Sequence, residues 1–212
     1  MLTVHHLGVS QSERIVWLCE ELGIEYKLVN HQRDPETRLA PEDYRALHPL
    51  GTAPIIHDGD IKLAESGAIA EYIMGKYGEG GLAVGPEAPN YADYLFWFHF
   101  ANGSFMPARM IDMVLHFLGA EDSEVAQMLK SRGMRVFDIL EHRLGQVDYL
   151  AGDAFTAADI MNFFPLTTMR QFVPMDMSPY PNIRAYMKRI GERPAYRSAM
   201  EKGDPGMELL LE

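Results

Sequence analysis

Residues 2–29, LTVHHLGVSQSERIVWLCEELGIEYKLV, decide the fold of the first part of the chain. Leu2–Leu7 is a short, mostly apolar run, so we expect a strand there. Apolar residues recur at helical spacing from Ser12 to Leu22, and Gly23 is a typical stop for a helix. Glu25–Val29 predicts a second strand. A strand, a helix and a second strand in this order indicate a sheet with helices packed on it.

The following residues continue this unit and complete its predicted order, βαβαββα. A short helix is expected at Glu42–Leu47, and Pro54–His57 and Ile61–Ala64 predict two short strands. Asp58-Gly59 lies between these strands and favours a hairpin turn. Ser66–Tyr77 has a helical pattern. The first part of the chain is therefore expected to be an α/β domain.

Residues 79–90, EGGLAVGPEAPN, are rich in Gly and Pro and lack periodicity, so we expect a linker there. Every pattern from Tyr91 onward is helical. The helices expected there are 91–118, 123–144, 156–170, 181–191 and a last short helix that Pro194 opens. The sequence thus predicts an α/β domain over residues 1–78 and an all-α domain over residues 91–212.

The composition excludes several classes of function. Of 212 residues, 19 are Lys or Arg and 30 are Asp or Glu, so the net charge is −11 and argues against nucleic acid as the partner. The single cysteine, Cys19, excludes an intramolecular disulfide, and no CxxC or HExxH motif indicates a metal site. The start, MLTVHHL, is unlike a signal peptide, and no run of about 20 apolar residues predicts a membrane helix. We therefore expect a cytoplasmic protein with no membrane partner.

Ser10 lies in the loop between the first strand and the first helix, and two interpretations fit it. Ser10-x-x-Glu13 matches a capping box, and Ser12 is an alternative cap. In the functional interpretation, a hydroxyl at a helix N-terminus donates a hydrogen bond to an anion in the positive field of the helix dipole. Cys19, on the apolar side of the same helix, is expected to be a buried thiol, the alternative being an exposed redox nucleophile.

Two further segments combine a structural and a functional interpretation. Thr52-Ala53-Pro54 lies at the start of the third strand. A trans bond before Pro54 is the ordinary expectation. In the functional interpretation this bond is cis, which would turn the Ala53 backbone outward so that it could pair with an extended peptide. Ser66 is a good helix cap, but the same helix start offers free N–H groups to a carboxylate, and Glu65 beside it could orient an ammonium group.

Aromatic and methionine side chains crowd residues 91–118, and the chain has 14 methionines. Such a stripe is usually core packing, but flexible methionines also suit a site that accepts varied apolar molecules. The candidates for lining an apolar pocket are Phe105, Met106, Arg109, Met113 and, as a polar neighbour, Asn102.

Residues 4–26, VHHLGVSQSERIVWLCEELGIEY, and 48–73, HPLGTAPIIHDGDIKLAESGAIAEYI, resemble the thioredoxin-like domain of glutathione transferases. In the second half, FTAAD at 155–159 is similar to the buried capping motif of that family, and YPNIRAYMKRIGERPAYRSAM at 180–200 resembles its C-terminal helices. Residues 5–23 together with WFHFANGSFMP at 97–107 are similar to a fungal and bacterial branch. The resemblance implies a thioredoxin-like domain followed by a helical domain.

The resemblance also implies roles for individual residues. Ser10 matches the serine that activates glutathione in serine-type classes, with Ser12 as the alternative. Ala53, before a presumed cis Pro54, matches the residue whose backbone pairs with the cysteinyl part of glutathione. Thr52, a further candidate contact, stands where many relatives have Lys or Gln.

Two pairs of residues are implied to hold the ends of glutathione. Glu65 and Ser66 match the acidic and hydroxyl pair that binds the γ-glutamyl end. Arg38 and His48 are candidates for the glycine carboxylate.

The implied activity is that of a glutathione transferase, which uses glutathione as cosubstrate and attacks a small electrophilic, apolar substrate in a detoxification role. A homodimer is implied as well. Two alternatives stay open: another glutathione-dependent enzyme on this fold (an isomerase, dehalogenase, etherase or peroxidase), and a non-catalytic protein that binds a macromolecular partner.

Overall fold

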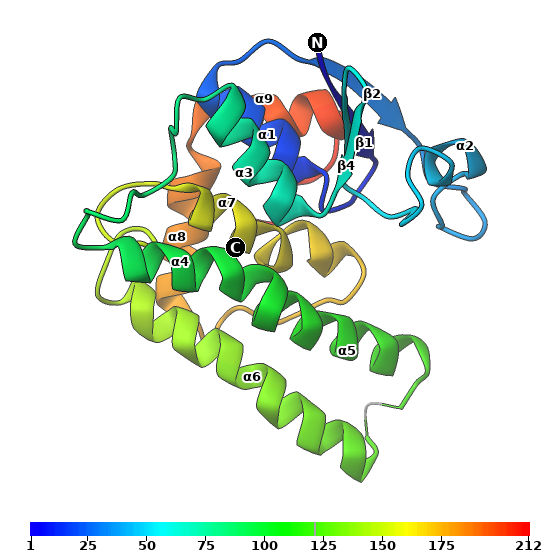
Figure 1. Ribbon diagram of the computed structural model, residues 1–212. Coiled ribbons are helices and arrows are strands. Elements are labelled where there is room, and N and C mark those ends of the chain that lie inside the picture. The colour runs from blue at the N-terminus through cyan, green and yellow to red at the C-terminus, as the bar shows by residue number, and fades with distance from the viewer. Residues whose placement is uncertain (121) are drawn as a thin grey trace. The chain divides into compact units, whose positions relative to one another are not determined.

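The computed structural model describes residues 1–120 and 122–212, which form two compact units (Figure 1). The first unit contains Met1–Ala83 and Glu192–Glu208, and the second contains Val84–Gly191 and Leu209–Glu212. The last helix of the chain therefore belongs to the first unit by its contacts. The domain boundaries at 1–78, 79–90 and 91–212 stay a prediction.

The first unit has the predicted order βαβαββα, closed by the last helix. Its elements are β1 (Leu2–Leu7), α1 (Glu13–Leu22), β2 (Lys27–His31), α2 (Glu42–Arg45), β3 (Ile55–Asp58), β4 (Ile61–Ala64), α3 (Ser66–Lys76) and α9 (Pro194–Gly203). The second strand begins two residues later than expected, and the hairpin turn lies at Gly59–Asp60 instead of one residue earlier. Gly59 has a φ of 60°, a left-handed conformation that glycine adopts without steric cost.

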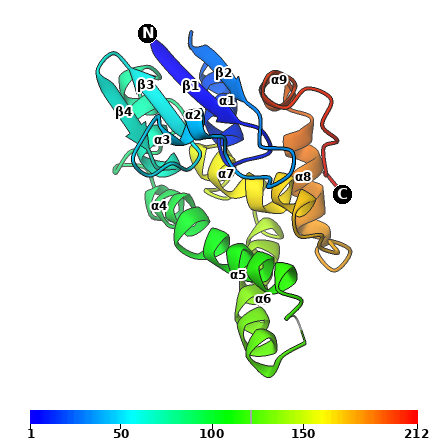
Figure 2. The same ribbon diagram turned by 90° about the vertical axis from the view of Figure 1, so that its right-hand side faces the viewer.

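The four strands form one mixed sheet in the order β2-β1-β3-β4 (Figure 2). β1 runs parallel to β2 and antiparallel to β3, and β3 and β4 form a hairpin. His5 lies opposite Ile55, and Ile55 lies opposite Ala64. The end of β1, the start of β3 and the end of β4 therefore meet at one edge of the sheet.

Helix α1 is buried between its neighbours because its apolar residues follow the helical period; Ile15, Val16 and Leu18 have no exposed surface. Helix α9, drawn in red, lies beside the blue α1 although it comes from the other end of the chain (Figure 1). Arg193 makes two hydrogen bonds of 2.7 Å to the carboxylate of Glu21 on α1. A bidentate pair of this kind adds geometric specificity to the apolar packing of the two helices.

The second unit is helical. Its elements are α4 (Tyr91–Phe100), a π-helical segment (Ala101–Phe105), α5 (Met106–Phe117), α6 (Glu124–Leu144), α7 (Ala157–Phe163), two short 3-10 turns (Phe164–Leu166 and Thr168–Gln171) and α8 (Pro181–Gly191). The helix expected over 91–118 is thus helical from 91 to 117, with a π-helical turn inside it. The expected helix over 156–170 ends early, because Pro165 removes a backbone donor from its pattern.

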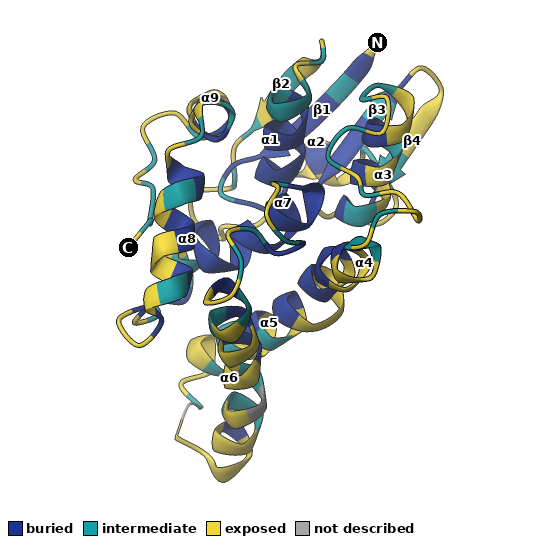
Figure 3. Ribbon diagram, turned by 90° about the vertical axis from the view of Figure 1, so that its left-hand side faces the viewer, coloured by how far each residue is buried: buried dark blue, intermediate teal, exposed yellow. Residues whose placement is uncertain are grey.

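Helix α7 is the buried centre of this unit, dark blue over its whole length in Figure 3. Asp159, with no exposed surface, accepts hydrogen bonds from the backbone N–H groups of Leu150 and Thr156 and from the Tyr186 hydroxyl. Thr156 in turn caps the helix through Ala158 N–H. The FTAAD segment thus forms the expected buried capping box.

Among the residues that the structure describes, none of the helices combines the length and the apolar character needed to cross a membrane. Over the same residues, no group of His, Cys, Asp and Glu side chains is placed to hold a metal ion.

Candidate functional site

The predicted site residues of the first unit lie in chain segments next to the strand ends at one edge of the sheet, the edge that can be followed in Figure 2. Leu7, Ile55 and Ala64, at the facing ends of β1, β3 and β4, are buried in one hydrophobic cluster. The segments that continue from these residues carry the predicted site residues: 8–12, 52–54 and 65–66. The sheet register brings these three segments close together. The candidate residues that they carry are therefore expected to form one site.

Ser10 and Ser12 lie together at the N-terminus of α1, with their hydroxyl oxygens 2.7 Å apart. Ser12 is fully buried, and its Oγ accepts a hydrogen bond from Leu7 N–H at 3.0 Å. Ser10 keeps 5% of its surface exposed. Ser10 is therefore the less deeply buried serine of this pair.

The capping box expected from Ser10-x-x-Glu13 does not form. Ser12 stands at the N-cap position of α1, where no side chain caps the helix. The Ser10 hydroxyl instead accepts a hydrogen bond from Ser12 N–H at 3.2 Å, while Glu13 N–H bonds to the Ser10 carbonyl. The first N–H groups of α1 bond to backbone carbonyl oxygens, Glu13 to Ser10 and Arg14 to Gln11, so the Ser10 hydroxyl does not act as the cap of this helix.

The loop that carries Ser10 is held from two sides. Arg33 donates to the carbonyl oxygens of Gly8 and Val9, at 2.8 and 3.2 Å. Asp204, just after α9, accepts from Val9 N–H at 3.0 Å. Val9 has a φ of 50°, a left-handed conformation that is costly for a β-branched residue and needs support from its surroundings.

Two residues of β1 and the C-terminal segment complete this region, and the sequence analysis missed them. His6 Nδ1 lies 3.0 Å from Ser12 Oγ, and His6 Nε2 lies 3.0 Å from Asp204 Oδ2. The alternation along a strand places His6 and His5 on opposite faces, which could have drawn attention to His6. No local signal could have linked it to Asp204, which follows 198 residues later.

Ser66 begins α3 and is 2% exposed. Arg14 Nη1 donates to Ser66 Oγ at 3.3 Å and to Gln11 Oε1 at 2.6 Å. Burial lowers the pKa of Arg14 to about 10, which still leaves it charged at neutral pH. A buried cation therefore lies beside the α3 N-terminus, and both favour an anion there.

Glu65 precedes this helix start and has an exposed side chain. Its φ of 71° is left-handed, and such a conformation in a non-glycine residue costs of order 1–3 kcal/mol. Backbone strain at the junction of β4 and α3 is compatible with a ligand contact at this residue.

Residues 52–54 approach the same edge from β3. The Ala53–Pro54 peptide bond is cis, as the resemblance implies and against the ordinary preference for trans. Ala53 packs against the Leu7 cluster, whereas Thr52 is exposed. Ala53 N–H and C=O belong to no ladder of the sheet, so they are available to an extended peptide.

Arg38 and His48, the candidates for a carboxylate contact, lie on either side of α2 in the segment between β2 and β3. Arg38 is exposed with a φ of 61°, and its carbonyl accepts from Arg33 at 2.9 Å. His48 is half-buried, and its Nδ1 accepts from Leu50 N–H at 3.1 Å. The role of Arg38 and His48 stays a prediction.

The candidates for the apolar pocket lie in the second unit and divide into two groups. Phe105 is fully buried against Phe137, and Met106 packs in a cluster with Phe164, Met169 and the half-buried Met113. Arg109 is 3% exposed and bonds to Asp112 and to the Val173 carbonyl. Asn102 is exposed in the π-helical segment. Met113 and Asn102 are thus the candidates with accessible surface.

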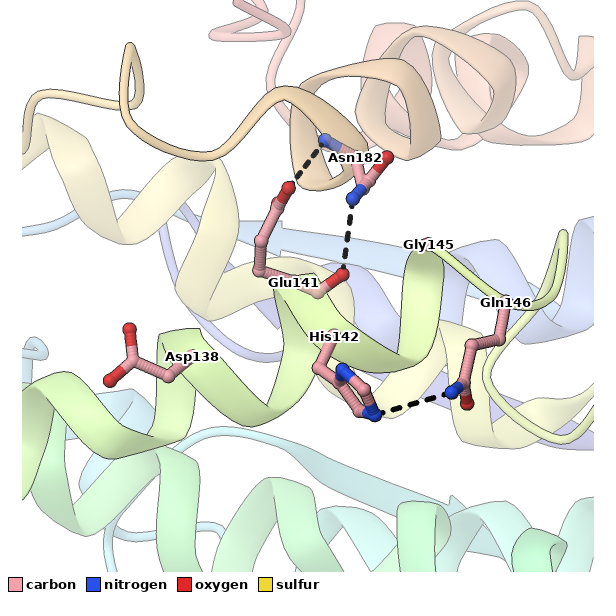
Figure 4. Close-up of a pocket in the computed structure, with 6 residues that line it drawn as sticks. All are labelled: Asp138, Glu141, His142, Gly145, Gln146 and Asn182. Carbon is pink, nitrogen blue, oxygen red and sulfur yellow. Dashed lines mark hydrogen bonds between the residues drawn. The ribbon is translucent and has the colours of Figure 1, made fainter.

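A separate polar pocket of about 490 Å³ lies between α6 and α8 (Figure 4). Its lining residues are Asp138, Glu141, His142, Gly145, Gln146 and Asn182. Glu141 accepts from the N–H groups of Asn182 and Ile183, so its carboxylate caps the N-terminus of α8. The pocket contains none of the predicted site residues. Within it, Asn182 bonds to Glu141, and Gln146 bonds to His142.

Cys19 has no exposed surface, and burial raises the pKa of its thiol to about 12. The thiolate is the reactive form of cysteine, so this thiol is inert in the folded protein. The expectation of a buried thiol is confirmed.

Models of protein families match both parts of the chain. The glutathione S-transferase N-terminal domain matches residues 2–75, and the glutathione S-transferase C-terminal domain matches residues 105–194.

Individual relatives agree with these domain matches. Glutathione S-transferase 3 of Schizosaccharomyces pombe is 32% identical over 95% of this chain and 88% of its own. Glutathione S-transferase 1 of Saccharomyces cerevisiae is 27% identical and covers 95% of each chain. A crystal structure of a glutathione S-transferase from Actinobacillus pleuropneumoniae matches with a TM-score of 0.88 and 33% identity, over 98% of this chain and 95% of that one. The two domain matches and the identity over nearly the whole chain show that the chain belongs to the glutathione S-transferase family.

Proposed function

We propose that this glutathione transferase is of the serine type, with Ser10 as the residue that stabilises the glutathione thiolate. The supporting observation is the position of Ser10. Ser10 keeps 5% of its surface exposed at the N-terminus of α1, at the sheet edge where Ala53 and Ser66 also lie. Ser12 is fully buried and bonded to the backbone of Leu7, so we assign it a supporting role.

The sizes of the available interactions are sufficient for this task. A thiol with a pKa near 8.5 is only a few per cent ionised near pH 7. Lowering that pKa by about two units requires roughly 2.7 kcal/mol of preferential stabilisation of the anion. One hydrogen bond from a hydroxyl to a charged group contributes about 1.5–3 kcal/mol, and a helix N-terminus adds about 0.3–1 kcal/mol. Ser10 at the start of α1 provides both.

The rest of glutathione would be held at the same edge. The exposed backbone of Ala53 would pair with the cysteinyl part, with Thr52 beside it. Ser66, the charged Arg14 and the α3 N-terminus would bind the γ-glutamyl carboxylate, and Glu65 would orient its ammonium group. Arg38 and His48 remain the candidates for the glycine carboxylate. These contacts position the sulfur, and orienting two reactants is itself a large part of the rate enhancement.

The second substrate is proposed to be a small, apolar electrophile. Met113 and Asn102 are the accessible candidates for contacting it, and Phe105, Met106 and Arg109 would shape the site from the packed interior of the helical unit. A flexible methionine tolerates substrates of different shapes. The electrophile is attacked by the thiolate, which forms the new carbon–sulfur bond as the leaving group departs.

Steady-state kinetics with glutathione and an activated aryl chloride test the assignment of Ser10. Ser10→Ala is expected to lower kcat/KM by about 10–150-fold, which corresponds to the loss of about 1.5–3 kcal/mol. Ser10→Thr should retain more activity because it keeps the hydroxyl. Ser123→Ala is the matched control, since Ser123 caps α6 through Ala126 N–H and lies in the other unit. An unchanged kcat/KM in Ser10→Ala would refute the assignment.

We also propose a homodimer in the cytoplasm. The support for a dimer is a row of exposed apolar side chains on α4 and α5, of a kind that marks protein interfaces. Its members are Leu95, Phe96, Met110, Ile111, Val114 and Phe117. Sedimentation equilibrium measures the molar mass in solution, and a mass of one chain at all concentrations would contradict the dimer.

A further inference from the structure

We propose that His6 and Asp204 take up the proton of the glutathione thiol, which reaches them through Ser10 and Ser12. This inference rests on the proposed function, since it assumes that the glutathione sulfur binds at Ser10. It adds a destination for the proton, which a hydrogen bond from Ser10 alone does not supply.

The four side chains form an unbroken line of hydrogen bonds. Ser10 Oγ lies 2.7 Å from Ser12 Oγ, Ser12 Oγ lies 3.0 Å from His6 Nδ1, and His6 Nε2 lies 3.0 Å from Asp204 Oδ2. All three distances are within the normal range for hydrogen bonds. Ser12 and His6 are fully buried; Ser10 at one end of the line keeps 5% of its surface exposed, and the Asp204 side chain at the other end keeps 9%.

The donors and acceptors of this line follow from the chemistry of its ends. A carboxylate only accepts hydrogen bonds, so His6 Nε2 carries a hydrogen that it donates to Asp204. In neutral His6, Nδ1 is then an acceptor. It lies 3.0 Å from Ser12 Oγ, closer than the Leu7 carbonyl at 3.3 Å to which this hydroxyl can also donate, so we assign the Ser12 proton to His6. Ser12 Oγ already accepts from Leu7 N–H, and its remaining lone pair accepts from the Ser10 hydroxyl. The Ser10 oxygen therefore faces an incoming thiol as an acceptor.

Transfer along this line balances at every atom. The thiol proton moves to Ser10 Oγ, the former Ser10 proton moves to Ser12 Oγ, and the former Ser12 proton moves to His6 Nδ1. The products are a thiolate that accepts a hydrogen bond from Ser10, and an imidazolium of His6 paired with the Asp204 carboxylate. Both serine hydroxyls are restored with reversed direction, and no proton enters or leaves the protein.

Asp204 is the acidic side chain that bonds to His6. On β2, the residue opposite His6 is Asn30, which is neutral. On α9, Gly203 lies close to the His6 ring, since a Cβ added to it would be 3.1 Å from His6 Nε2. Arg33 is a cation near Asp204 and holds the same loop. The Asp204 carboxylate is thus the group that compensates a charged His6, in a setting where an unpaired buried charge would be costly.

A purely structural role for the same residues makes a different prediction. Asp204 also accepts from Val9 N–H, so it could act only by holding the Ser10 loop in place. In that case the thiol proton would leave to solvent. Counting released protons distinguishes the two roles, because a relay keeps the proton inside the protein.

The experiment combines two measurements on the same binding reaction. Ultraviolet thiolate absorbance gives the fraction of bound glutathione that is ionised. Titration calorimetry in buffers of different ionisation enthalpy gives the number of protons released on binding. For the wild-type protein at neutral pH we expect thiolate formation with far less than one proton released per thiolate. One proton released per thiolate would overturn the relay, and this result needs no variant.

A second test measures the pKa of bound glutathione in the variant Asp204→Asn. The amide oxygen can still accept from Val9 N–H, so the loop keeps its support, but the amide N–H₂ faces His6 Nε2. His6 must then carry its hydrogen on Nδ1, which can no longer accept a proton. We expect the pKa of bound glutathione to rise by about one unit or more, a tenfold loss of thiolate. Asp176→Asn is the control, since this exposed carboxylate likewise accepts from a backbone N–H, that of Ser178.

The outcomes separate this inference from the proposed function. Glutathione that binds without forming a thiolate in the wild type would contradict the proposed function and the relay with it. A thiolate that forms in the wild type and equally in Asp204→Asn would overturn the relay and leave Ser10 in place. If Asp204→Asn does not fold, the double variant His6→Asn with Asp204→Asn removes the proton acceptor and its carboxylate partner together, and the same rise in thiol pKa is expected.

Discussion

Ser12 Oγ lies 2.7 Å from Ser10 Oγ, but the two serines have opposite environments. Ser12 is fully buried and bonded to Leu7 N–H, whereas Ser10 keeps 5% of its surface exposed at the sheet edge. We therefore assign different roles to these two serines, although they are close in sequence and in space. The inner one holds the turn between β1 and α1, and we propose that the outer one contacts glutathione.

This division predicts different effects of the two alanine variants on stability. Ser12→Ala leaves the buried Leu7 N–H without its side-chain acceptor, so the free energy of unfolding is expected to fall by about 1–3 kcal/mol. Ser10→Ala should cost less, because its partner Ser12 keeps other bonds. Urea unfolding of both variants measures the difference. A larger loss of stability in Ser10→Ala would contradict the assignment of the two environments.

The Asp159 carboxylate is predicted to be the most sensitive polar group of the helical unit. Asp159→Ala would strand three buried donors, on Leu150, Thr156 and Tyr186. Each stranded donor costs about 1–3 kcal/mol, so the expected loss is at least about 3 kcal/mol. Thermal or urea unfolding checks this value. Asp176→Ala, on an exposed turn, is the control and should cost less than about 1 kcal/mol.

The pH dependence of stability is predicted to include a contribution from His5. Burial, then the charges of His57, His31 and Lys27, lower the pKa of His5 to about 4 from the ordinary 6.5. Between these values the unfolded chain binds a proton that the folded protein does not, so stability is lost as the pH falls through this range.

His5→Phe keeps a ring at this position and removes the titration. Its stability should therefore fall less steeply than that of the wild type as the pH is lowered from about 6.5 to about 4. Denaturant unfolding at several pH values measures the slope. His142→Gln, on an exposed position of α6, is a control that should leave the slope unchanged. A slope in His5→Phe equal to that of the wild type would show that His5 does not carry the effect.

The sequence predicts most of the elements because local signals decide them. The alternation and turn residues of the first unit, the Gly23 stop of α1 and Pro181 at the start of α8 all act within a few residues. The same holds for the position of Ser10 after β1 and of Ser66 at the start of α3. These residues come together because the sheet register aligns three chain segments.

The parts that the sequence did not predict depend on distant contacts. The π-helical segment at 101–105 inserts a wider turn into an otherwise uniform apolar pattern, and no residue type marks it. The choice between Ser10 as a cap and as a free hydroxyl is decided by His6 and Leu7, which draw Ser12 inward. The pairing of His6 with Asp204 joins the two ends of the chain and has no local signal.

The most direct test of the account is the pKa of glutathione bound to the wild type and to Ser10→Ala, measured by ultraviolet thiolate absorbance. The account predicts a thiol pKa well below 8.5 in the wild type, and a return toward 8.5 in Ser10→Ala with binding retained. A lowered pKa that the substitution leaves unchanged would contradict the central claim and transfer the role to Ser12 or to the N–H groups of α1.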